Sequence, residues 1–156
     1  MQPPGLVIRR HPYEEPYHVQ LEFTASNGMF AGSTDIYCNV ADITNIGCGL
    51  LAFPSKAGDE YVYEYGSEDP NARLYRHFVL RAYTIDGVGH CALQFAINLN
   101  QSEPEEGVCR FSIPVEPGAL NRLGKLFTVF AELRHLELQW SPISGGLYEH
   151  HQAPTA

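Results

Sequence analysis

The residues best suited to chemistry gather around one glycine-rich turn. His90 follows Asp86 across a Gly-Val-Gly segment, and Arg81 and Cys91 lie nearby in the sequence. An imidazole beside a carboxylate can transfer a proton, and with a thiolate it can bind a metal ion. The competing interpretation is that Asp86-Gly87 begins a hairpin turn, where Asp and His side chains usually hydrogen-bond the local backbone. We favour the turn, because a catalytic pair also needs a pocket around it.

The other motifs of known chemistry are absent from the sequence. The seven histidines show no H-E-x-x-H spacing and the four cysteines show no C-x-x-C spacing, so no metal site is predicted. The serine motif G-x-S-x-G and the glycine-rich phosphate loops are absent as well. The sequence therefore predicts no catalytic residue and no cofactor. It leaves enzymatic activity open and favours a non-catalytic role.

A pocket beside the hairpin of residues 74–90 is the alternative site. It would bind a small ligand or substrate through the side chains of His77, Arg81 and His90. This alternative requires the three side chains to converge in a cavity between the hairpin and the sheet.

Acidic residues gather in two further segments that contain no base. They are Asp59, Glu60, Glu64, Glu68 and Asp69 in the first segment, and Glu103, Glu105 and Glu106 in the second. Such runs are usually a solvated edge, but on one side of the fold they would form a patch suited to a basic protein partner. The whole chain has 18 acids against 10 bases, a net charge of −8. This charge disfavours nucleic acid and anionic membranes as partners, and the oligomeric state stays undetermined.

The composition is typical of one folded domain. The chain has 156 residues, of which 44% are hydrophobic, so it is long enough to bury a core without a disulfide or metal. No stretch approaches the length of a membrane span, and the first ten residues lack the apolar core of a signal peptide. We therefore expect a cytoplasmic protein with reduced cysteines.

The elements that must position these residues follow from hydrophobic periodicity. Helical spacing predicts one helix from Asn39, with a capping box formed with Asp42, to its end before Pro54. It predicts a second helix from Pro117 to Phe130. Alternation of apolar and polar residues predicts strands over residues 19–23, 29–39, 60–65, 74–85, 92–100, 109–115 and 136–140. This order predicts an α+β fold with a mainly antiparallel sheet of six or seven strands and both helices on one face.

The two ends of the chain are expected to lie outside this sheet, which places the domain at residues 19–140. Four prolines in residues 1–18 predict an extended arm that cannot form an inner strand, because proline donates no ladder hydrogen bond. Residues 141–156 have no periodicity and predict a loosely ordered tail.

The two predicted helices suggest an internal repeat. A shift of 77 positions places Ile43, Ile46, Gly47, Leu50 and Phe53 on Leu120, Leu123, Gly124, Phe127 and Phe130. Any two amphipathic helices share their aliphatic positions, but glycine inside a helix costs about 1 kcal/mol relative to alanine and marks close backbone approach. The pattern therefore indicates a possible strand, strand, helix, strand repeat, with glycines where helix and sheet come closest.

Three tyrosines alternate along one predicted strand. Tyr61, Tyr63 and Tyr65 share one face, which is either an exposed binding platform or a cover beneath a helix or loop. We favour the cover, with the hydroxyl groups at the rim.

Two segments carry a resemblance to known proteins. Residues 80–94, with Gly89-His90 in a hairpin, and residues 116–124, with a Pro-Gly helix start, resemble small uncharacterised bacterial proteins. More distantly, they resemble immunity-type proteins encoded beside polymorphic toxins. The resemblance implies a non-catalytic protein-binding domain, an immunity protein that neutralises a toxin by covering a basic surface. The alternatives are the ligand pocket at residues 74–90 and a structural subunit that oligomerises through a sheet edge or the tyrosine face.

Overall fold

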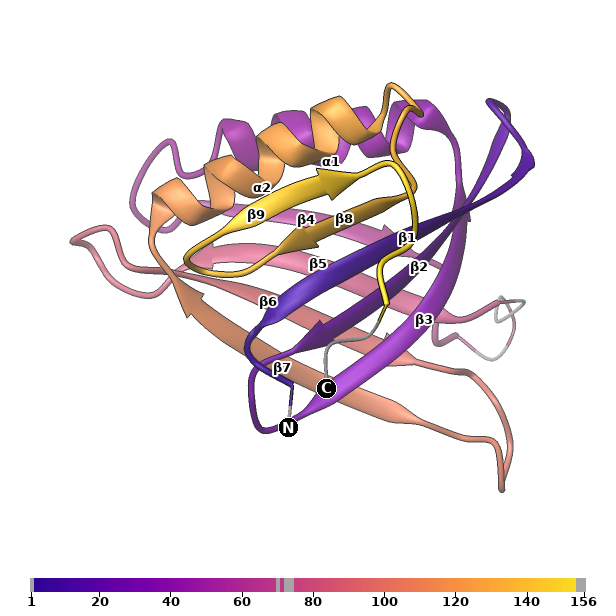
Figure 1. The fold of residues 1–156 in the computed structure, drawn as a ribbon. Helices are drawn as coiled ribbons and strands as arrows, with labels where there is room; N and C mark the ends of the chain where they lie inside the picture. Colours follow the sequence, from indigo (N-terminus) through magenta and orange to yellow (C-terminus); the bar gives the residue numbers. More distant parts are fainter. Residues whose placement is uncertain (1, 70, 72–74, 154–156) are drawn as a thin grey trace.

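The strands divide between two antiparallel sheets rather than forming one. The computed structural model describes residues 2–69, 71 and 75–153, and within them the chain forms nine strands and two helices (Figure 1). One sheet has the order β3-β2-β1-β8-β9 and the other the order β4-β5-β6-β7. The elements are β1 (Gly5–Glu14), β2 (His18–Ser26), β3 (Ala31–Cys38), α1 (Val40–Leu51), β4 (Glu60–Tyr65), β5 (His77–Thr84), β6 (Cys91–Asn98), β7 (Val108–Val115), α2 (Pro117–Phe130), β8 (Glu137–Trp140) and β9 (Gly145–Tyr148).

The α+β class and the two helices are therefore confirmed, and the single sheet of six or seven strands is wrong. Alternation shows which face of a strand is buried, but it does not show which strands are neighbours. The capping box of α1 is present as predicted, since the Asn39 side chain accepts from Asp42 N at 2.9 Å and Asp42 accepts from Asn39 N at 3.0 Å.

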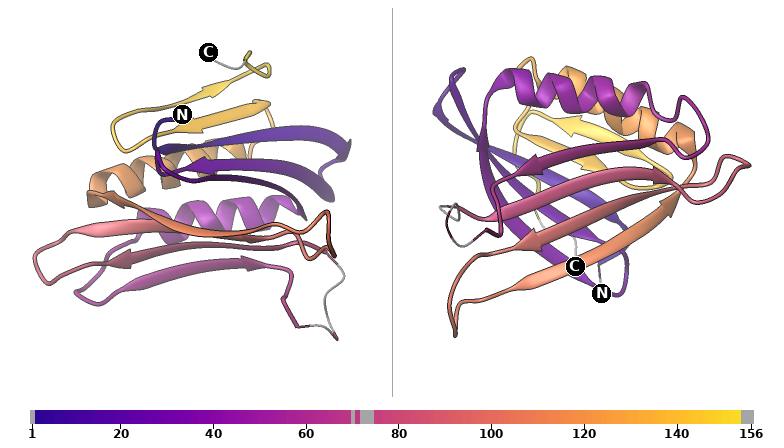
Figure 2. Two further views of the ribbon diagram at one scale, coloured as in Figure 1. Left: turned by 90° about the horizontal axis from the view of Figure 1, so that it is seen from below. Right: turned by 180° about the vertical axis from the view of Figure 1, so that it is seen from behind.

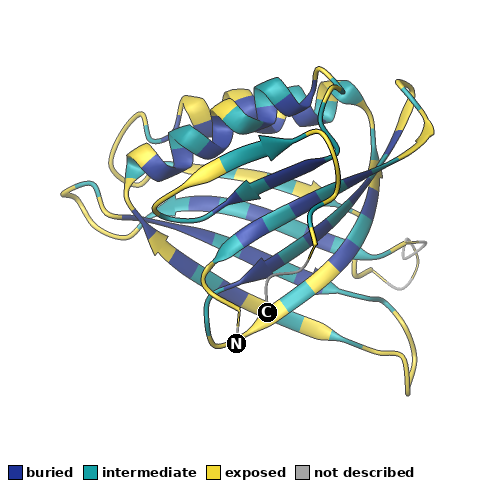
Figure 3. Ribbon diagram, in the orientation of Figure 1, coloured by how far each residue is buried: buried dark blue, intermediate teal, exposed yellow. Residues whose placement is uncertain are grey.

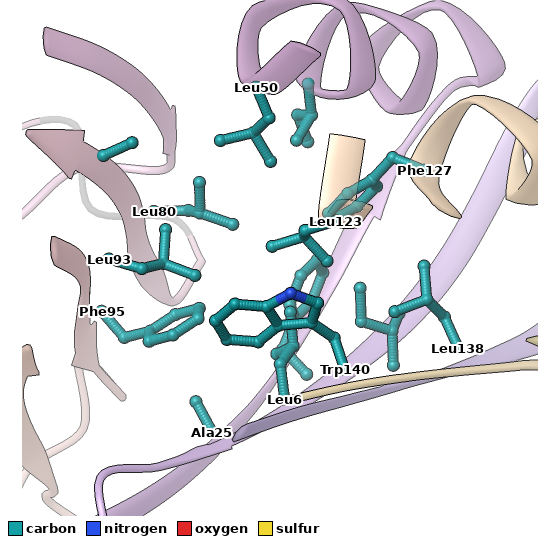
Figure 4. Close-up of a cluster of buried hydrophobic side chains, with 14 of the residues drawn as sticks. Leu6, Ala25, Leu50, Leu80, Leu93, Phe95, Leu123, Phe127, Leu138 and Trp140 are labelled. Carbon is teal, nitrogen blue, oxygen red and sulfur yellow. The ribbon is translucent and has the colours of Figure 1, made fainter. Parts of the chain in front are cut away.

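The inner faces of the two sheets enclose the hydrophobic core. Buried and exposed residues alternate along the strands (Figure 3), and the aromatic rings of Phe23 on β2 and Phe78 on β5 meet across the sheets with centroids 4.6 Å apart. The helices lie side by side and close the core along one side (Figures 1 and 2). Trp140 of β8 lies among leucines from both sheets and from α2 (Figure 4), and its indole N–H donates to the carbonyl of Ala119 at 2.8 Å.

β1 is an inner strand, so the prediction of an extended N-terminal arm outside the sheet is wrong. It pairs with β2 on one side and β8 on the other, and Leu6 and Ile8 lie in the core. The first two prolines precede the strand. Pro12 falls where the register with β2 shifts between His11 and Glu14, a place where the ladder does not need its missing N–H.

The C-terminal segment is also better anchored than its sequence predicted. β9 pairs with β8, and the chain then passes over the outer face of the five-stranded sheet (Figure 1). There the Gln152 carbonyl accepts from Arg9 Nη2 at 2.6 Å, and the Gln152 N–H donates to Glu137 Oε1 at 3.1 Å. These contacts use the backbone of the segment, so hydrophobic periodicity gave no sign of them.

The internal repeat is present in the order of the elements, and it is longer than predicted. Each copy has three strands, a helix and a strand: β1-β2-β3-α1-β4 is followed by β5-β6-β7-α2-β8. The strand predicted at residues 74–85 thus begins the second copy instead of separating the copies. β4 pairs with β5, and β8 pairs with β1, so the last strand of each copy completes the sheet of the other.

The paired glycines lie where the two helices cross, and not between helix and sheet as predicted. A Cβ atom on Gly47 would lie 2.9 Å from the carbonyl oxygen of Gly124 and 2.7 Å from Thr128 Cγ2. A Cβ atom on Gly124 would lie 2.8 Å from the carbonyl oxygen of Gly47 and 2.7 Å from the nitrogen of Leu51. Each glycine therefore meets the backbone of the other, as expected for a two-fold related contact.

Candidate functional site

The outer face of the four-stranded sheet is left uncovered by the other elements in the described part of the chain. Alternate residues of β4 to β7 point away from the core onto this face, because the residues between them, such as Phe78 and Leu80, are buried. Within the described residues, neither helix and no strand of the other sheet crosses it (Figure 2, right). We refer to it below as the open face.

A polar network joins side chains from all four strands of the open face. Arg81 on β5 donates through Nε to Glu60 on β4 at 2.5 Å, and its guanidinium carbon lies 4.2 Å from the ring centroid of Tyr83. The Tyr83 hydroxyl lies 2.9 Å from the Ser112 hydroxyl on β7. The Tyr83 ring therefore reaches across β6 beside its register partner Ala92, which is only 2% exposed.

The network holds a planar cation on an aromatic ring. Glu60 and Gln94 bind the guanidinium, with Gln94 Oε1 accepting from Arg81 Nη1 at 3.4 Å, while Ser112 holds the ring from the other side. One third of the Arg81 side chain stays exposed. A guanidinium oriented in this way can stack on a further planar group and can donate hydrogen bonds to an anion.

The acidic residues of the open face lie on β4 and its loop, and β5 or β6 engages each of them. His77 lies between two carboxylates, with Nε2 2.7 Å from Glu64 and Nδ1 3.3 Å from Glu68. Glu60 binds Arg81 as described, and Asn98 donates to Glu68 at 3.4 Å. β6 and β7 contain no acid, and the exposed Arg110 on β7 has no ion-pair partner among the described residues. The β6–β7 half of the face is therefore free of negative charge.

The acidic residues predicted to bind a partner do not form one patch. Asp59 precedes β4 at one end of the sheet, whereas Glu68, Asp69 and the segment 103–106 leave the sheet at the other end. The Asp59 carboxylate accepts hydrogen bonds from the N–H and hydroxyl of Ser55, and the backbone bond in particular lowers its pKa. Several of these acids therefore have structural partners of their own.

The three residues of the predicted ligand pocket do not converge. His77 and Arg81 are ion-paired on the open face. Among the described residues, His90 lines one of the two cavities beside the β5–β6 turn, and neither His77 nor Arg81 lines either of them. The first residue of the predicted hairpin, Leu74, lies outside the described residues. The prediction that His77, Arg81 and His90 line one pocket is therefore wrong, because alternation along β5 turns the side chains of His77 and Arg81 toward the open face.

In the turn containing His90, the Asp86 side chain hydrogen-bonds the local backbone, as the sequence indicated. Asp86 accepts from the N–H groups of Val88 at 2.9 Å and His90 at 3.2 Å, and its second oxygen lies 2.6 Å from His90 Nδ1. The hydrogen bond with Asp86 raises the pKa of His90, and the same bond lowers the pKa of Asp86.

Substitution Asp86→Asn should lower the pKa of His90 toward its ordinary value of 6.5, measured by NMR titration of the imidazole protons. The raised His90 pKa contributes stability below pH 6.5 that is lost as the pH rises through the folded-state value. The lowered Asp86 pKa contributes stability above pH 3.8 that is lost as the pH falls. The pair therefore stabilises most between these values, and an unchanged His90 pKa in the variant would contradict the assignment.

The tyrosine row on β4 covers the core side of its sheet, which confirms the favoured interpretation. A Cβ atom on Gly49 of α1 would lie 2.2 Å from the Tyr61 ring, and Tyr63 packs against Phe78 with ring centroids 6.5 Å apart. The tyrosine of interest on the open face is the half-buried Tyr83 instead. Its place on the polar side of the alternation in residues 74–85 was visible in the sequence, but its neighbours Ser112 and Gln94 were not.

The comparisons with known proteins find similar structures only at low identity. No protein-family model matches the chain, and no curated protein matches it. The structure of the plant transcriptional regulator PBF-2 is similar, with 14% identity and a TM-score of 0.45 over 83% of this chain and 76% of that chain. WHY3 and WHY1 from Arabidopsis thaliana are similar with 11% and 12% identity and TM-scores of 0.42 and 0.44. They cover 84% and 83% of this chain, and 83% and 79% of their own.

The function inferred from the sequence is corrected here. The acidic residues predicted to bind a basic partner do not form one patch, so the immunity protein with a basic protein partner is withdrawn. The exclusion of nucleic acid rested on the net charge alone and is withdrawn as well, because β6 and β7 contain no acid. Neither a bacterial origin nor an oligomeric subunit gains support. No helix in the described part of the chain is long and apolar enough to span a membrane.

Proposed function

We propose that the open face binds single-stranded nucleic acid. The observation that carries this proposal is the stack of Arg81 on Tyr83, held from both sides on a sheet face that nothing in the described chain covers. Single strands are bound by aromatic rings and guanidinium planes on which unpaired bases stack. A base stacked on the exposed plane of Arg81 would extend an arrangement that is already ordered, so little side-chain entropy is lost on binding.

The remaining side chains of the open face suit the backbone and edges of such a strand. Arg110, which has no ion-pair partner in the described part of the chain, supplies a cation for a phosphate, and Gln94 and Asn98 offer amide groups for base edges. Small residues such as Ala96 leave room for bases to approach the sheet. Because the acids lie along β4, we expect the nucleic-acid strand to pass over β5, β6 and β7.

The net charge of −8 weakens the attraction of the protein for nucleic acid but does not exclude binding. Charge acts over about 10 Å at 0.1 M salt, so a ligand responds mainly to the groups on the face it meets. The acids elsewhere still weaken long-range attraction, and we expect an affinity in the micromolar range at low salt. A reducing compartment such as the cytoplasm is part of the proposal, supported by four free cysteines.

A fluorescence anisotropy titration with a labelled fifteen-nucleotide oligo(dT) at about 50 mM salt tests the proposal. We expect Tyr83→Ala and Arg81→Ala each to weaken binding about tenfold, the loss typical of one removed stacking contact. Arg110→Ala should weaken binding. It should also reduce the slope of the logarithm of the binding constant against the logarithm of the salt concentration by about one.

The matched control is Arg134→Ala, because the exposed Arg134 is paired with Glu132 beyond the end of α2. It should leave the affinity unchanged. The proposal fails if the native protein does not bind the oligonucleotide, or if the Arg134 variant loses as much affinity as the Arg81 and Tyr83 variants.

A further inference from the structure

A cavity separate from the open-face network lies where the two sheets meet the start of α2. It is open to solvent on one side and has a volume of about 460 Å³. The β5–β6 turn, the end of β7 and the β8–β9 turn form its walls. The apolar part of the lining consists of Ile85, Cys91, Pro114, Val115, Pro142 and Ile143.

The polar lining of this cavity carries an excess of negative charge. Asp86 and His90 lie 2.6 Å apart and largely neutralise each other when His90 is protonated. Glu116, the N-cap residue of α2, makes no side-chain capping bond and has no ion pair among the described residues. Neither lysine nor arginine lines the cavity. One carboxylate is therefore available beside an apolar wall.

We propose that this cavity binds a small organic ammonium ion with a compact apolar body. The ammonium group would pair with Glu116, and the apolar body would lie against Ile85, Val115 and Ile143. Ile143 is 90% exposed in the structure, so a ligand that covers it also removes apolar surface from water.

The charge distribution distinguishes this ligand class from the others. An anion would meet the carboxylate of Glu116, and like charges at close range oppose binding. A neutral apolar molecule would use the wall but leave the carboxylate without a partner. His90 forms its ion pair with Asp86 and none with Glu116, although after Asp86 the charge of the nearby Glu116 also raises the pKa of His90.

Three probes of the same shape test the proposal on the full chain: cyclohexylammonium, cyclohexanol and cyclohexanecarboxylate. Each is titrated while ¹⁵N–¹H NMR spectra are recorded. Cyclohexylammonium should give saturable shifts at the residues of the two turns and at Glu116. Cyclohexanol should bind about fivefold more weakly, and cyclohexanecarboxylate should give no saturable shifts.

Glu116→Gln should reduce the affinity for cyclohexylammonium about fivefold, to that of cyclohexanol, because it keeps the shape of the side chain and removes its charge. Ile143→Ser should weaken both probes. The matched control is Glu105→Gln, which removes a charge from the exposed β6–β7 loop outside the cavity. Equal affinity for all three probes, shifts outside the cavity, or an unchanged affinity in the Glu116 variant would each overturn the proposal. No oligonucleotide is present, so the result is independent of nucleic-acid binding.

Discussion

Substitution Gly124→Val should lower the free energy of unfolding by about 3 kcal/mol, the upper range for overpacking a close contact. A side chain at this position meets the carbonyl oxygen of Gly47 at 2.8 Å and the nitrogen of Leu51 at 2.7 Å. Both are backbone atoms of α1, so relief requires the helices to separate. Separation would loosen the core below them, because each helix buries its apolar face there.

The two-fold relation of the helices leads to a second prediction, for Gly47. Gly47→Val should cost a similar amount, and the double variant should cost clearly less than the sum, since one substitution already separates the helices. Urea unfolding monitored by Trp140 fluorescence measures all three variants. Additive losses would show that the two glycines do not share one contact.

The control for these variants is Gly118→Ala. Gly118 lies in the first turn of α2, and a Cβ atom there has no neighbour within 4 Å. Alanine is the better helix former by up to about 1 kcal/mol, so this variant should be neutral or more stable. If Gly118→Ala and Gly124→Val lost comparable stability, the close contact at the helix crossing would not be the cause of the loss.

Substitution Arg10→Met should lower the free energy of unfolding by about 3–5 kcal/mol, the loss typical of breaking a buried ion pair. Arg10 is 4% exposed, and its guanidinium donates to both oxygens of Glu15 at 2.5 and 2.6 Å. It also donates to the carbonyl oxygens of His135 at 3.0 Å and Leu133 at 3.1 Å. Methionine retains part of the apolar stem but leaves these acceptors without their donor.

Two comparisons separate this effect from a general loss of charge. Arg10→Lys should recover only part of the stability, because an ammonium group cannot reproduce the planar fork that reaches Glu15 and two carbonyls. Arg134→Met removes an exposed ion pair with Glu132 and should cost no more than about 1 kcal/mol. Urea unfolding of the three variants measures the order of their stability losses. Equal losses of stability at Arg10 and Arg134 would contradict the buried role of Arg10.

Arg10 also shows why the prediction for the N-terminal segment was wrong. The four prolines predicted an extended arm, and nothing in the sequence was a reason to place Arg10 inside, since arginine is rarely buried without partners. The partners, at Glu15 and in the segment after α2, are assembled only by the fold. The alternating burial of Leu6, Ile8 and Arg10 is the pattern of a strand, but its third member is a cation.

Local features of the sequence determined most of the elements. The strand containing Leu93, Phe95 and Ile97 follows from a period of two, and the start of α1 follows from the Asn39–Asp42 capping box. These features act between residues that are neighbours in the chain, so they can be found without knowing the fold.

The candidate site was only partly visible from the sequence. Arg81 and Glu60 were noted for their charge, but as members of two different sites. The antiparallel register of β4 and β5 brings them into contact, and the register of β6 with β7 places Ser112 where the Tyr83 hydroxyl reaches it. Such pairs depend on strand register, and no local pattern in these segments specifies it.

The sequence by itself determined the two amphipathic helices, seven of the nine strands described, and the glycine pair at a shift of 77 positions. Only the tertiary structure decided that the strands form two sheets, that β4 and β8 are exchanged between the repeats, and that Gly47 and Gly124 meet each other. The physical reason is that periodicity indicates which side chains must leave water but does not identify what they pack against. That choice depends on the burial and backbone pairing of the whole chain.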